Sequence, residues 1–403
     1  MRLPAFGLTR DEPGLSTGSI HDNQGGSCPA WPPLIGGPQG SRQLLARGPS
    51  EDNAMNAITR EEILADMLRV YRYQAANQTR SVVRRSGKTR FIKDTDWERG
   101  VFWSCVAAAW QATGDQCYLD GVMNYTLHTG FRTGPNARFA DDMVCCQAYL
   151  DVYSQVEQPE ALEPTIKALG QMVDEPRPGR EDWWWCDALF MAPPAFAALS
   201  ARTGDSRYVD YMDVAFWDAV DHLYDPESGL FYRDYRYIPD GQGGELREEN
   251  GEKVFWSRGN GWVLAAVPRI LAHLPADHPS RARYLALFGD LAETISDYQQ
   301  ADGMWRTSMR DPERFPAAES SATALFCYGL AWGIAQGLLA RERYQPIVER
   351  AWAALHGCIQ PNGMLGWVQL PAFNPRDVQA QHNIDYGAGA YLLAGCAMLD
   401  LYA

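Results

Sequence analysis

Apolar residues recur every three or four positions through most of the chain, which is the spacing of one face of an α-helix. The pattern begins with Ile63, Met67 and Tyr71. Just before it, Thr59 is followed three residues later by Glu62, the capping-box pair that marks a helix start. The same periodicity predicts further helices over roughly 101–113, 116–128, 139–155, 160–173, 188–203, 206–222, 260–273, 280–300, 319–338, 343–358 and 384–402.

Strand-like alternation is scarce and short. It is confined to two stretches, around Leu230–Tyr237 and Gly366–Leu370. Because helical periodicity covers most of the remaining chain from residue 59 onward, the sequence predicts an all-α fold.

Internal repetition indicates how these helices are arranged. Ala112–Asp120 returns as Arg202–Asp210, and each copy carries a Thr-Gly-Asp segment between two predicted helices. A glycine that ends one helix and an aspartate that caps the next are typical of a helical hairpin. The offset of 90 residues corresponds to two hairpins of about 45 residues each.

A second recurring device is a glycine turn followed by an aromatic residue, as in Ser228–Phe231, Asp302–Trp305 and Asn362–Trp367. Each lies between one predicted hairpin and the next, where a loop would cross the rim of a barrel. About eleven or twelve helices in hairpin repeats with such loops predict a closed (α/α)6 barrel. An open helical solenoid is the alternative, and the closed form is favoured because so many aromatic residues require a shared concave face.

The first 54 residues differ from the rest in composition. They are rich in Gly, Pro, Ser and Arg and lack the apolar core of a signal peptide. We interpret 1–54 as a disordered leader, or as sequence upstream of a true start at Met55, and 55–403 as a single catalytic domain.

Composition excludes several classes of function. The net charge of −14 argues against nucleic acid or an anionic membrane as the main partner. No apolar run is long enough to span a membrane. The nine cysteines include no CxxC pair and there are seven histidines, so we expect no disulfide framework, no metal site and no cofactor. Reduced thiols suggest a cytoplasmic protein, and the oligomeric state stays open.

Four stretches combine acidic or basic residues with aromatic residues at the predicted starts of helices. In a barrel of this type, the inner-helix starts on one side form the active cleft. The stretches are Trp97–Trp103, Phe139–Met143, Trp183–Met191 and Val254–Trp262.

Each of these residues also has a purely structural interpretation. Asp187 follows three tryptophans, whose rings would stack on a sugar and raise the pKa of the carboxyl, yet aspartate is also a favoured helix cap. Asp141 and Asp142 are equally suited to capping a helix. Arg258 could pair with a surface acid, and Trp262 could belong to the core. Glu319 could cap a helix or support the cleft, and the sequence does not rank the two. Cys145, Cys146 and Cys186 are expected to be small buried apolar residues.

Taken together, these motifs resemble those of the unsaturated glycuronyl hydrolases. Arg258-Gly259-Asn260-Gly261-Trp262, Trp185-x-Asp187 and the helix start at Asp141 carry the resemblance, and Glu319–Phe326 extends it. The similarity runs from about Thr95 to the C-terminus. Within this group the chain is similar to the unsaturated rhamnogalacturonyl hydrolases, glycoside hydrolase family 105.

The resemblance implies a substrate and a reaction. Members of the family remove the 4,5-unsaturated uronic acid that polysaccharide lyases leave at the non-reducing end of an oligosaccharide. They hydrate the C4=C5 double bond, and the resulting hemiketal opens and expels the rest of the chain. By position, Asp187 matches the general acid and base and Asp141 the second carboxylate, with Asp142 as its substitute. The matched substrate-pocket positions are Trp185, Arg258 and Trp262.

Two departures from the family pattern concern the aglycone. Many members carry a histidine after the tyrosine of the GLxY turn, whereas Tyr232 is followed here by Arg233. Many also have a loop bearing Lys or His before the WxD motif, whereas this chain has Pro176–Asp182, which includes Arg177 and Arg180. We expect these three arginines to suit an anionic or differently linked aglycone, from pectin, ulvan or another polysaccharide.

Two alternatives remain at this point. Sugar 2-epimerases share the barrel but need paired histidines, and none of the seven histidines lies in the four stretches. A non-catalytic barrel that only binds oligosaccharides would have no reason to keep both Asp141 and Asp187.

Overall fold

The computed structural model describes residues 58–402, except for 84–86, 137 and 157. These residues belong to one unit, Ala57–Ala403. The predicted leader, 1–54, lies outside the described residues.

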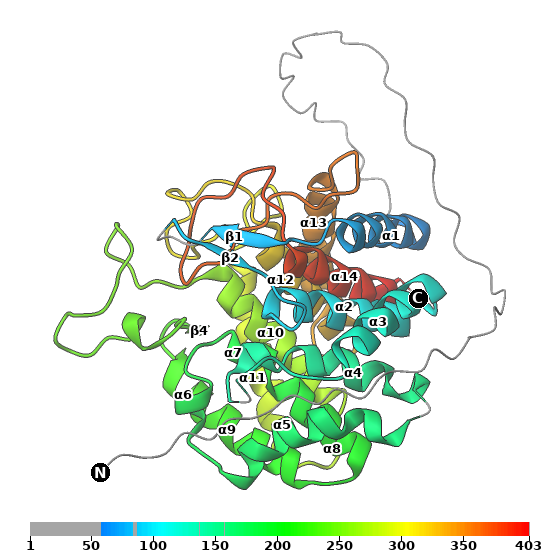
Figure 1. The fold of residues 1–403 in the computed structure, drawn as a ribbon. Helices are drawn as coiled ribbons and strands as arrows, with labels where there is room; N and C mark the ends of the chain where they lie inside the picture. Colours follow the sequence, from blue (N-terminus) through cyan, green and yellow to red (C-terminus); the bar gives the residue numbers. More distant parts are fainter. Residues whose placement is uncertain (1–57, 84–86, 137, 157, 403) are drawn as a thin grey trace, which may run out of the picture. The chain divides into compact units, whose positions relative to one another are not determined.

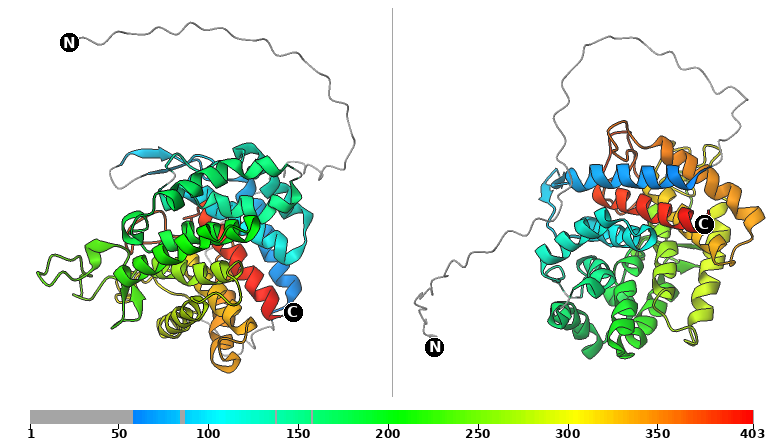
Figure 2. Two further views of the ribbon diagram at one scale, coloured as in Figure 1. Left: turned by 90° about the horizontal axis from the view of Figure 1, so that it is seen from below. Right: turned by 90° about the vertical axis from the view of Figure 1, so that its right-hand side faces the viewer.

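Six helices form the inner ring of a barrel. Successive members of the ring contact one another, and the last contacts the first, so the ring is closed. Figures 1 and 2 show the last helix, in red, beside the first two, in blue and cyan. The inner helices are α2 (Trp97–Thr113), α4 (Cys145–Val152), α8 (Pro193–Thr203), α10 (Ser257–Leu271), α12 (Ser320–Ala335) and α14 (Asp385–Leu401).

Six further helices alternate with these along the chain and lie outside the ring. They are α1 (Arg60–Ala76), α3 (Gln116–Thr129), α5 (Glu163–Asp174), α9 (Arg207–Leu223), α11 (Arg281–Ser296) and α13 (Arg341–Gly357). Almost every residue of α12 and α14 is buried, whereas α1 and α13 bury one stripe each. The predicted all-α (α/α)6 barrel is confirmed, and the contact of α14 with both α1 and α2 excludes the open solenoid.

The predicted helix boundaries follow the expected chemistry. Thr59 and Glu62 form both bonds of a capping box at the start of α1. Gly114 ends α2 with a φ of 68°, in the left-handed region that glycine tolerates best, and the Asp115 side chain accepts a bond from the next helix's Cys117 N–H. Gly204 ends α8 in the same way, with a φ of 72°.

Strands are a minor part of the described residues. One hairpin pairs β1 (Ser81–Val83) with β2 (Thr89–Phe91), and another pairs β3 (Tyr224–Asp225) with β4 (Leu230–Phe231). The predicted strand at 366–370 is wrong: these residues form a loop whose polar groups bond to helix starts instead of to another strand. The other alternating stretch keeps only β4, followed by a 3-10 turn at Tyr235–Tyr237.

Helix α8 begins late because of two prolines, Pro193 and Pro194. The chain first forms a four-residue helix, α7 (Ala188–Met191), and then starts again at Pro193. Pro194 has no N–H to offer the Phe190 carbonyl four residues earlier. The side chain of Gln147 on α4 donates to that carbonyl at 2.7 Å and to the Met191 carbonyl at 3.2 Å. Such a replacement bond avoids a cost of about 1–3 kcal/mol for a buried unpaired group.

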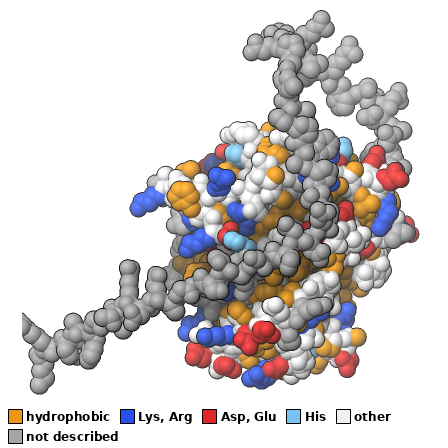
Figure 3. All heavy atoms as spheres, turned by 45° about the vertical axis from the view of Figure 1, so that its right-hand side comes forward, with side chains coloured by type: hydrophobic (Ala, Val, Ile, Leu, Met, Phe, Trp, Pro, Cys, Tyr) orange, Lys and Arg blue, Asp and Glu red, His pale blue; other side chains and the backbone are white. Residues whose placement is uncertain are grey.

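The surface carries charges of both signs. On the face drawn in Figure 3, acidic and basic side chains lie interspersed among apolar ones. Within 58–402, apart from the omitted positions, no helix is long and apolar enough to cross a membrane.

Candidate active site

All four predicted stretches lie at one end of the barrel, where the inner helices begin. We call this end the amino mouth. The starts of the helices are joined by direct contacts: the Trp97 and Tyr386 rings stack at 4.7 Å, and Tyr386 lies 4.8 Å below the Arg258 guanidinium. The positive ends of six helix dipoles therefore face one region, which favours a negatively charged ligand there.

The three consecutive tryptophans have three different surroundings. Trp183 is fully buried between Phe196 and Tyr211 and belongs to the core. Trp185 is 2% exposed and packs on the Phe139 ring at 5.0 Å. Trp184, which is partly exposed, tilts against Trp185 at 4.8 Å. The expected aromatic wall is thus formed on its solvent side by Trp184, with Trp185 behind it.

Asp187 is not used as a helix cap, although it occupies the cap position of α7. Its carboxylate is 8% exposed, and Oδ2 lies 3.5 Å from Nε of Arg233 and 3.6 Å from the thiol of Cys186. Burial raises the pKa of Asp187, while the charges of Arg233 and Arg258 oppose that rise. The side chain is therefore free for proton chemistry.

Asp141 lies in a 3-10 turn, Ala140–Asp142, just before α4. It is partly buried and has no hydrogen bond to any described residue. Burial and the negative charge of Asp187 together raise the pKa of Asp141 well above its ordinary value, with Arg233 opposing. The two carboxyl groups therefore share one electrostatic environment.

The adjacent Asp142 has a structural role. Its Oδ2 accepts a bond of 2.8 Å from the Asn136 backbone N–H, and its carbonyl accepts one of 2.8 Å from Gly134. These bonds hold the loop that leads into the 3-10 turn. Asp142 is therefore committed to the loop, and Asp141 is the carboxylate left available.

The environments of the two acids differ in one respect. Arg233 and Arg258 both oppose protonation of Asp187, whereas Arg233 alone is a prominent opponent at Asp141. Positive charge therefore opposes protonation of Asp187 from two side chains, and protonation of Asp141 chiefly from one.

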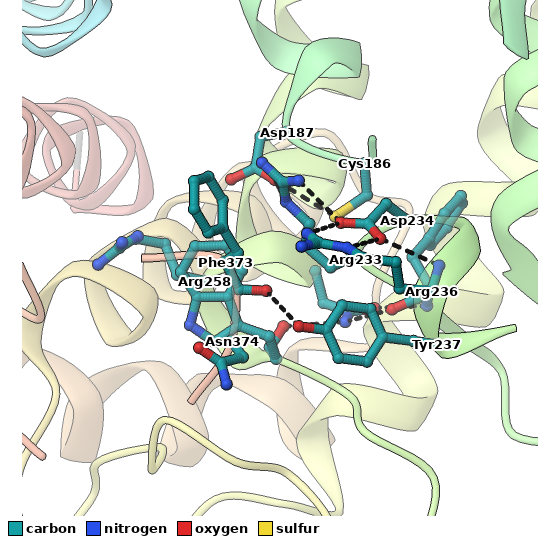
Figure 4. Close-up of polar contacts among 12 residues, drawn as sticks. Cys186, Asp187, Arg233, Asp234, Arg236, Tyr237, Arg258, Phe373 and Asn374 are labelled. Carbon is teal, nitrogen blue, oxygen red and sulfur yellow. Dashed lines mark hydrogen bonds and ion pairs between the residues drawn. The ribbon is translucent and has the colours of Figure 1, made fainter. Parts of the chain in front are cut away.

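Arg233 is held beside Asp187 by a second acid. Asp234 is fully buried and accepts bonds from Nη1 of Arg233 at 2.8 Å and from Nη2 of Arg236 at 2.6 Å (Figure 4). The Arg233 guanidinium also lies 4.9 Å from the centre of the Phe373 ring and 5.4 Å from that of Trp184.

The segment Arg258–Asn260 explains why this motif has its particular residues. A side chain at Gly259 would approach the Cys186 sulfur to 2.8 Å, so glycine allows α10 to pack against the segment that carries the catalytic candidate. The Asn260 side chain bonds both the N–H and the carbonyl of Phe231, at 2.8 and 3.1 Å. It thereby fixes the strand that leads to Arg233.

Arg258 itself is 1% exposed and supports the site from behind. Its guanidinium donates to the carbonyls of Gln369 and Leu370 and lies between the rings of Trp256 and Tyr386, at 4.5 and 4.8 Å. Its charge still reaches Asp187.

Trp262 is fully buried. Its ring contacts Phe190 at 4.7 Å and Tyr386 at 6.3 Å, and its indole N–H has no partner among the described residues. Its neighbour Phe190 belongs to α7, so Trp262 packs against the helix that carries Asp187 at its start.

Glu319 combines the two roles that the sequence left open. Its carboxylate caps α12 by accepting from the N–H groups of Ser321 and Ala322, at 3.1 and 2.6 Å. It also accepts from the Gln369 N–H at 3.0 Å. The cap of one helix therefore holds the loop at 369–376.

Of the three arginines expected near the aglycone, Arg233 alone contacts the acids described above. Arg180 forms a bidentate pair with Asp218 on α9, at 2.7–3.1 Å, and Arg177 is exposed. Sequence reasoning missed Asp234, Phe373 and Gln369. Asp234 follows Arg233 directly and could have been noticed, but nothing in the sequence marks the other two.

No group of three or more potential metal ligands occurs within the described residues. Cys145, Cys146 and Cys186 form no disulfide bond and are buried as expected.

Comparisons with known proteins agree with this geometry. The model of Glycosyl Hydrolase Family 88 matches residues 69–402. The chain is 34% identical over 361 residues to the unsaturated 3S-rhamnoglycuronyl hydrolase of Formosa agariphila, covering 86% of this chain and 93% of that protein. It is 37% identical over 280 residues to a protein of the same name from an Alteromonas species, covering 64% of this chain and 66% of that protein.

Among solved structures, the glycosyl hydrolase family 88 protein from Bacteroides vulgatus matches with a TM-score of 0.76 at 30% identity. The match covers 85% of this chain and 100% of that one. The predicted resemblance to the unsaturated glycuronyl hydrolases is confirmed.

Proposed function

The chain belongs to glycosyl hydrolase family 88, and from this premise we propose how its amino mouth removes a 4,5-unsaturated uronic acid from the end of an oligosaccharide. The observation that carries the proposal is the pair Asp141 and Asp187. Both have raised pKa values, one has no hydrogen bond within the described residues, and both lie within the field of Arg233. Family membership favours this function over the epimerase and the non-catalytic barrel.

The reaction is a hydration. A carboxylic acid donates its proton to C4, and the electron pair of the C4=C5 bond forms the new C4–H bond. The cation left at C5 is stabilised by the ring oxygen, and a water molecule adds there while a carboxylate takes its proton. The C5 hemiketal then opens to a ketone, which frees the hemiacetal at C1 to expel the aglycone. We assign the proton transfers to Asp187 with Asp141 as its partner.

The two arginines provide a way for substrate binding to promote protonation of Asp187. In the free protein the positive charges of Arg233 and Arg258 oppose protonation of Asp187. The substrate carries its own carboxylate on C5, beside the reacting bond. When that carboxylate binds near Arg233 or Arg258, it offsets the charge that opposes protonation of Asp187. Substrate binding therefore raises the pKa of Asp187 and places a proton on it where the reaction needs one.

The identity of the aglycone, the sugar next to the unsaturated uronate, is a separate part of the proposal. Both of the relatives described above are named unsaturated 3S-rhamnoglycuronyl hydrolase. We propose the same substrate class here, a lyase product in which the unsaturated uronate is linked to sulfated rhamnose. The position of Arg233, beside Asp187 and bordered by Trp184 and Phe373, supports this proposal because it puts a cation between the acid and the exposed Phe373 ring.

The test is a panel of lyase products from ulvan, rhamnogalacturonan and glycosaminoglycans. The protein should abolish the ultraviolet absorbance of the conjugated uronate and turn over the ulvan product fastest. Unchanged absorbance with every product would overturn the proposed reaction. Faster turnover of an unsulfated rhamnogalacturonan product would overturn the sulfated aglycone alone.

A further inference from the structure

Gln369 is a buried residue whose backbone joins the starts of three inner helices. It is 1% exposed. Its N–H donates to Glu319, the cap of α12, at 3.0 Å, and its carbonyl accepts from Arg258 of α10 and from the hydroxyl of Tyr386 at the start of α14. The loop that follows therefore starts from a fixed point at the amino mouth.

The side chain of Gln369 fixes the loop a second time. Its Oε1 accepts from the indole N–H of Trp256 at 2.8 Å, and its Nε2 donates to the carbonyl of Asn374 at 2.9 Å. A single amide thus links the residue before α10 to a point five residues further along its own loop. Only a side chain with both an acceptor and a donor at its end can make both bonds.

The residue held by this arrangement is Phe373. Its carbonyl accepts from the hydroxyl of Tyr237 at 3.1 Å, so the loop is held at two successive carbonyls, those of Phe373 and Asn374. The ring is 56% exposed, yet it lies 4.9 Å from the Arg233 guanidinium and 5.5 Å from that of Arg236 (Figure 4). Arg233 in turn lies beside Asp187.

An exposed aromatic ring next to a proton-transfer site is a surface for a sugar. The apolar C–H face of a pyranose packs against an aromatic ring, and burying a phenylalanine contributes about 1.5–3 kcal/mol. Arg236, whose side chain is 38% exposed, lies at the same ring and can face an anionic substituent.

We propose that Phe373 is the platform for the sugar next to the unsaturated uronate, and that Gln369 is the positioning residue that holds it beside Asp187. This inference rests on the proposed function, since it assumes that the uronate lies at Asp187. It adds a residue-level account of selectivity: the 369–376 loop recognises the aglycone, whereas the two carboxyl groups act on the uronate.

The test compares two substrates that share the unsaturated uronate. One carries the natural neighbouring sugar, and the other carries a methyl group in its place. The measured quantity is the ratio of kcat/KM for the sugar-bearing substrate to kcat/KM for the methyl glycoside. Effects on proton transfer or on the fold enter both values and cancel in the ratio.

Phe373→Ala and Gln369→Met should each lower this ratio by about tenfold, the factor that corresponds to 1.4 kcal/mol. Gln379→Met, an exposed glutamine further along the same segment, is the matched control and should leave the ratio within about twofold. An unchanged ratio in Phe373→Ala would overturn the platform, and an unchanged ratio in Gln369→Met would overturn the positioning role.

Gln369→Glu separates positioning from general packing. The glutamate keeps an acceptor for Trp256, but it can donate to the Asn374 carbonyl only when protonated. Its ratio should therefore recover toward the wild-type value as the pH falls, whereas a ratio that stays low at every pH would contradict the role of the hydrogen bond. If the wild-type protein acts on neither substrate, the proposed function fails instead.

Discussion

The two ends of the barrel are built from the same six helices, but they differ in how completely their buried charged groups are paired. At the amino mouth, Asp141 lacks a hydrogen bond to any described residue, and Asp187 has long contacts, 3.5 Å with Arg233 and 3.6 Å with the Cys186 thiol. At the other end, which we call the carboxyl mouth, Arg269 donates to Gln147 at 2.7 Å and lies 3.3 Å from Asp151.

The carboxyl mouth also contains a cavity of about 350 Å³. Each inner helix contributes to its wall near the end of the helix, for example with Ala112, Asp151, Ala198, Arg269, Trp332 and Ala397. The negative ends of the helix dipoles gather there, which disfavours an anion such as a uronate. The carboxyl mouth is thus hollow and contains a charge pair, and the other acid in its wall, Asp400, is exposed, where water can satisfy it, unlike the buried Asp187.

This difference indicates where catalytic groups are found in such a barrel. Polar and charged groups with complete sets of partners hold the helices together, as Gln147 and Arg269 do behind α7. Charges with incomplete sets are costly to the fold, and their persistence indicates use. The predictions below test this contrast, beginning with the largest expected effect.

Asp187→Asn should lower kcat by at least about a hundredfold, the lower end of the effect of removing a general acid. The side chain has no capping bond to lose, so the melting temperature should not fall. Steady-state kinetics and thermal unfolding on the same preparation measure both quantities. A variant with near-normal turnover would remove Asp187 from the reaction.

Arg269→Met makes the converse change at the carboxyl mouth. It leaves Asp151 as a buried charge without its cation, and we expect a loss of about 3 kcal/mol in the free energy of unfolding. Turnover at a temperature where the variant is folded should stay within about twofold, because no reacting group is altered. A large loss of kcat with unchanged stability would reverse the assignment of the two mouths.

Asp141→Asn should raise the stability of the free protein at neutral pH by about 1 kcal/mol while reducing activity. The folded-state pKa of Asp141 is raised, so its contribution to stability is present at low pH and is lost as the pH rises through that pKa. The asparagine does not ionise. Unfolding curves at several pH values should therefore show the gain above the folded-state pKa of Asp141 and none at acidic pH, below the ordinary pKa of a carboxyl group.

Arg233→Met should move the alkaline limb of the kcat/KM profile to higher pH. The positive charge of Arg233 opposes protonation of both Asp187 and Asp141, so its removal raises the pKa of each. The position of the limb, not the height of the profile, is the quantity to measure. A shift to lower pH would contradict the electrostatic account.

Asp142→Asn should have the smallest effect. Its carboxylate bonds only the Asn136 N–H within the described residues, and an asparagine side chain keeps an acceptor for that bond. Activity should stay within about threefold of the wild type. Equal losses in Asp141→Asn and Asp142→Asn would show that the turn as a whole matters, and not one carboxylate.

Much of the fold could be predicted from local sequence patterns. Helical periodicity placed the barrel helices, most of them to within about five residues at each end, and the Thr59 and Gly114 signals marked helix ends correctly. The predicted helix over 139–155 is shorter, Cys145–Val152, because 3-10 turns flank it on both sides. The strand predicted at 366–370 failed because alternation also occurs in a loop that is held by distant partners. Apart from its bond to Asn374, Gln369 forms its hydrogen bonds with residues 17 to 113 positions away, and no local pattern encodes them.

Site residues could be predicted where neighbouring residues form a recognisable motif. They could not be predicted where their role depends on partners that only the fold brings close. Asp187 stood out because three tryptophans precede it, although the structure shows that Trp183 belongs to the core. Arg180 looked as suitable as Arg233, and only the fold shows that it pairs with Asp218 instead. Phe373 carries no signal at all, since its importance comes from the guanidinium groups beside it.

The most direct test of the central claim uses a substrate in which the glycosidic oxygen is replaced by sulfur. Hydration of the C4=C5 bond does not require that link to break first, whereas direct displacement begins by protonating it. The wild-type protein should therefore abolish the ultraviolet absorbance of the sulfur-linked substrate at a rate within about tenfold of the natural one, and Asp187→Asn should be at least about a hundredfold slower. A wild-type protein that cleaves the natural substrate but leaves the double bond of the sulfur analogue intact would contradict hydration at Asp187.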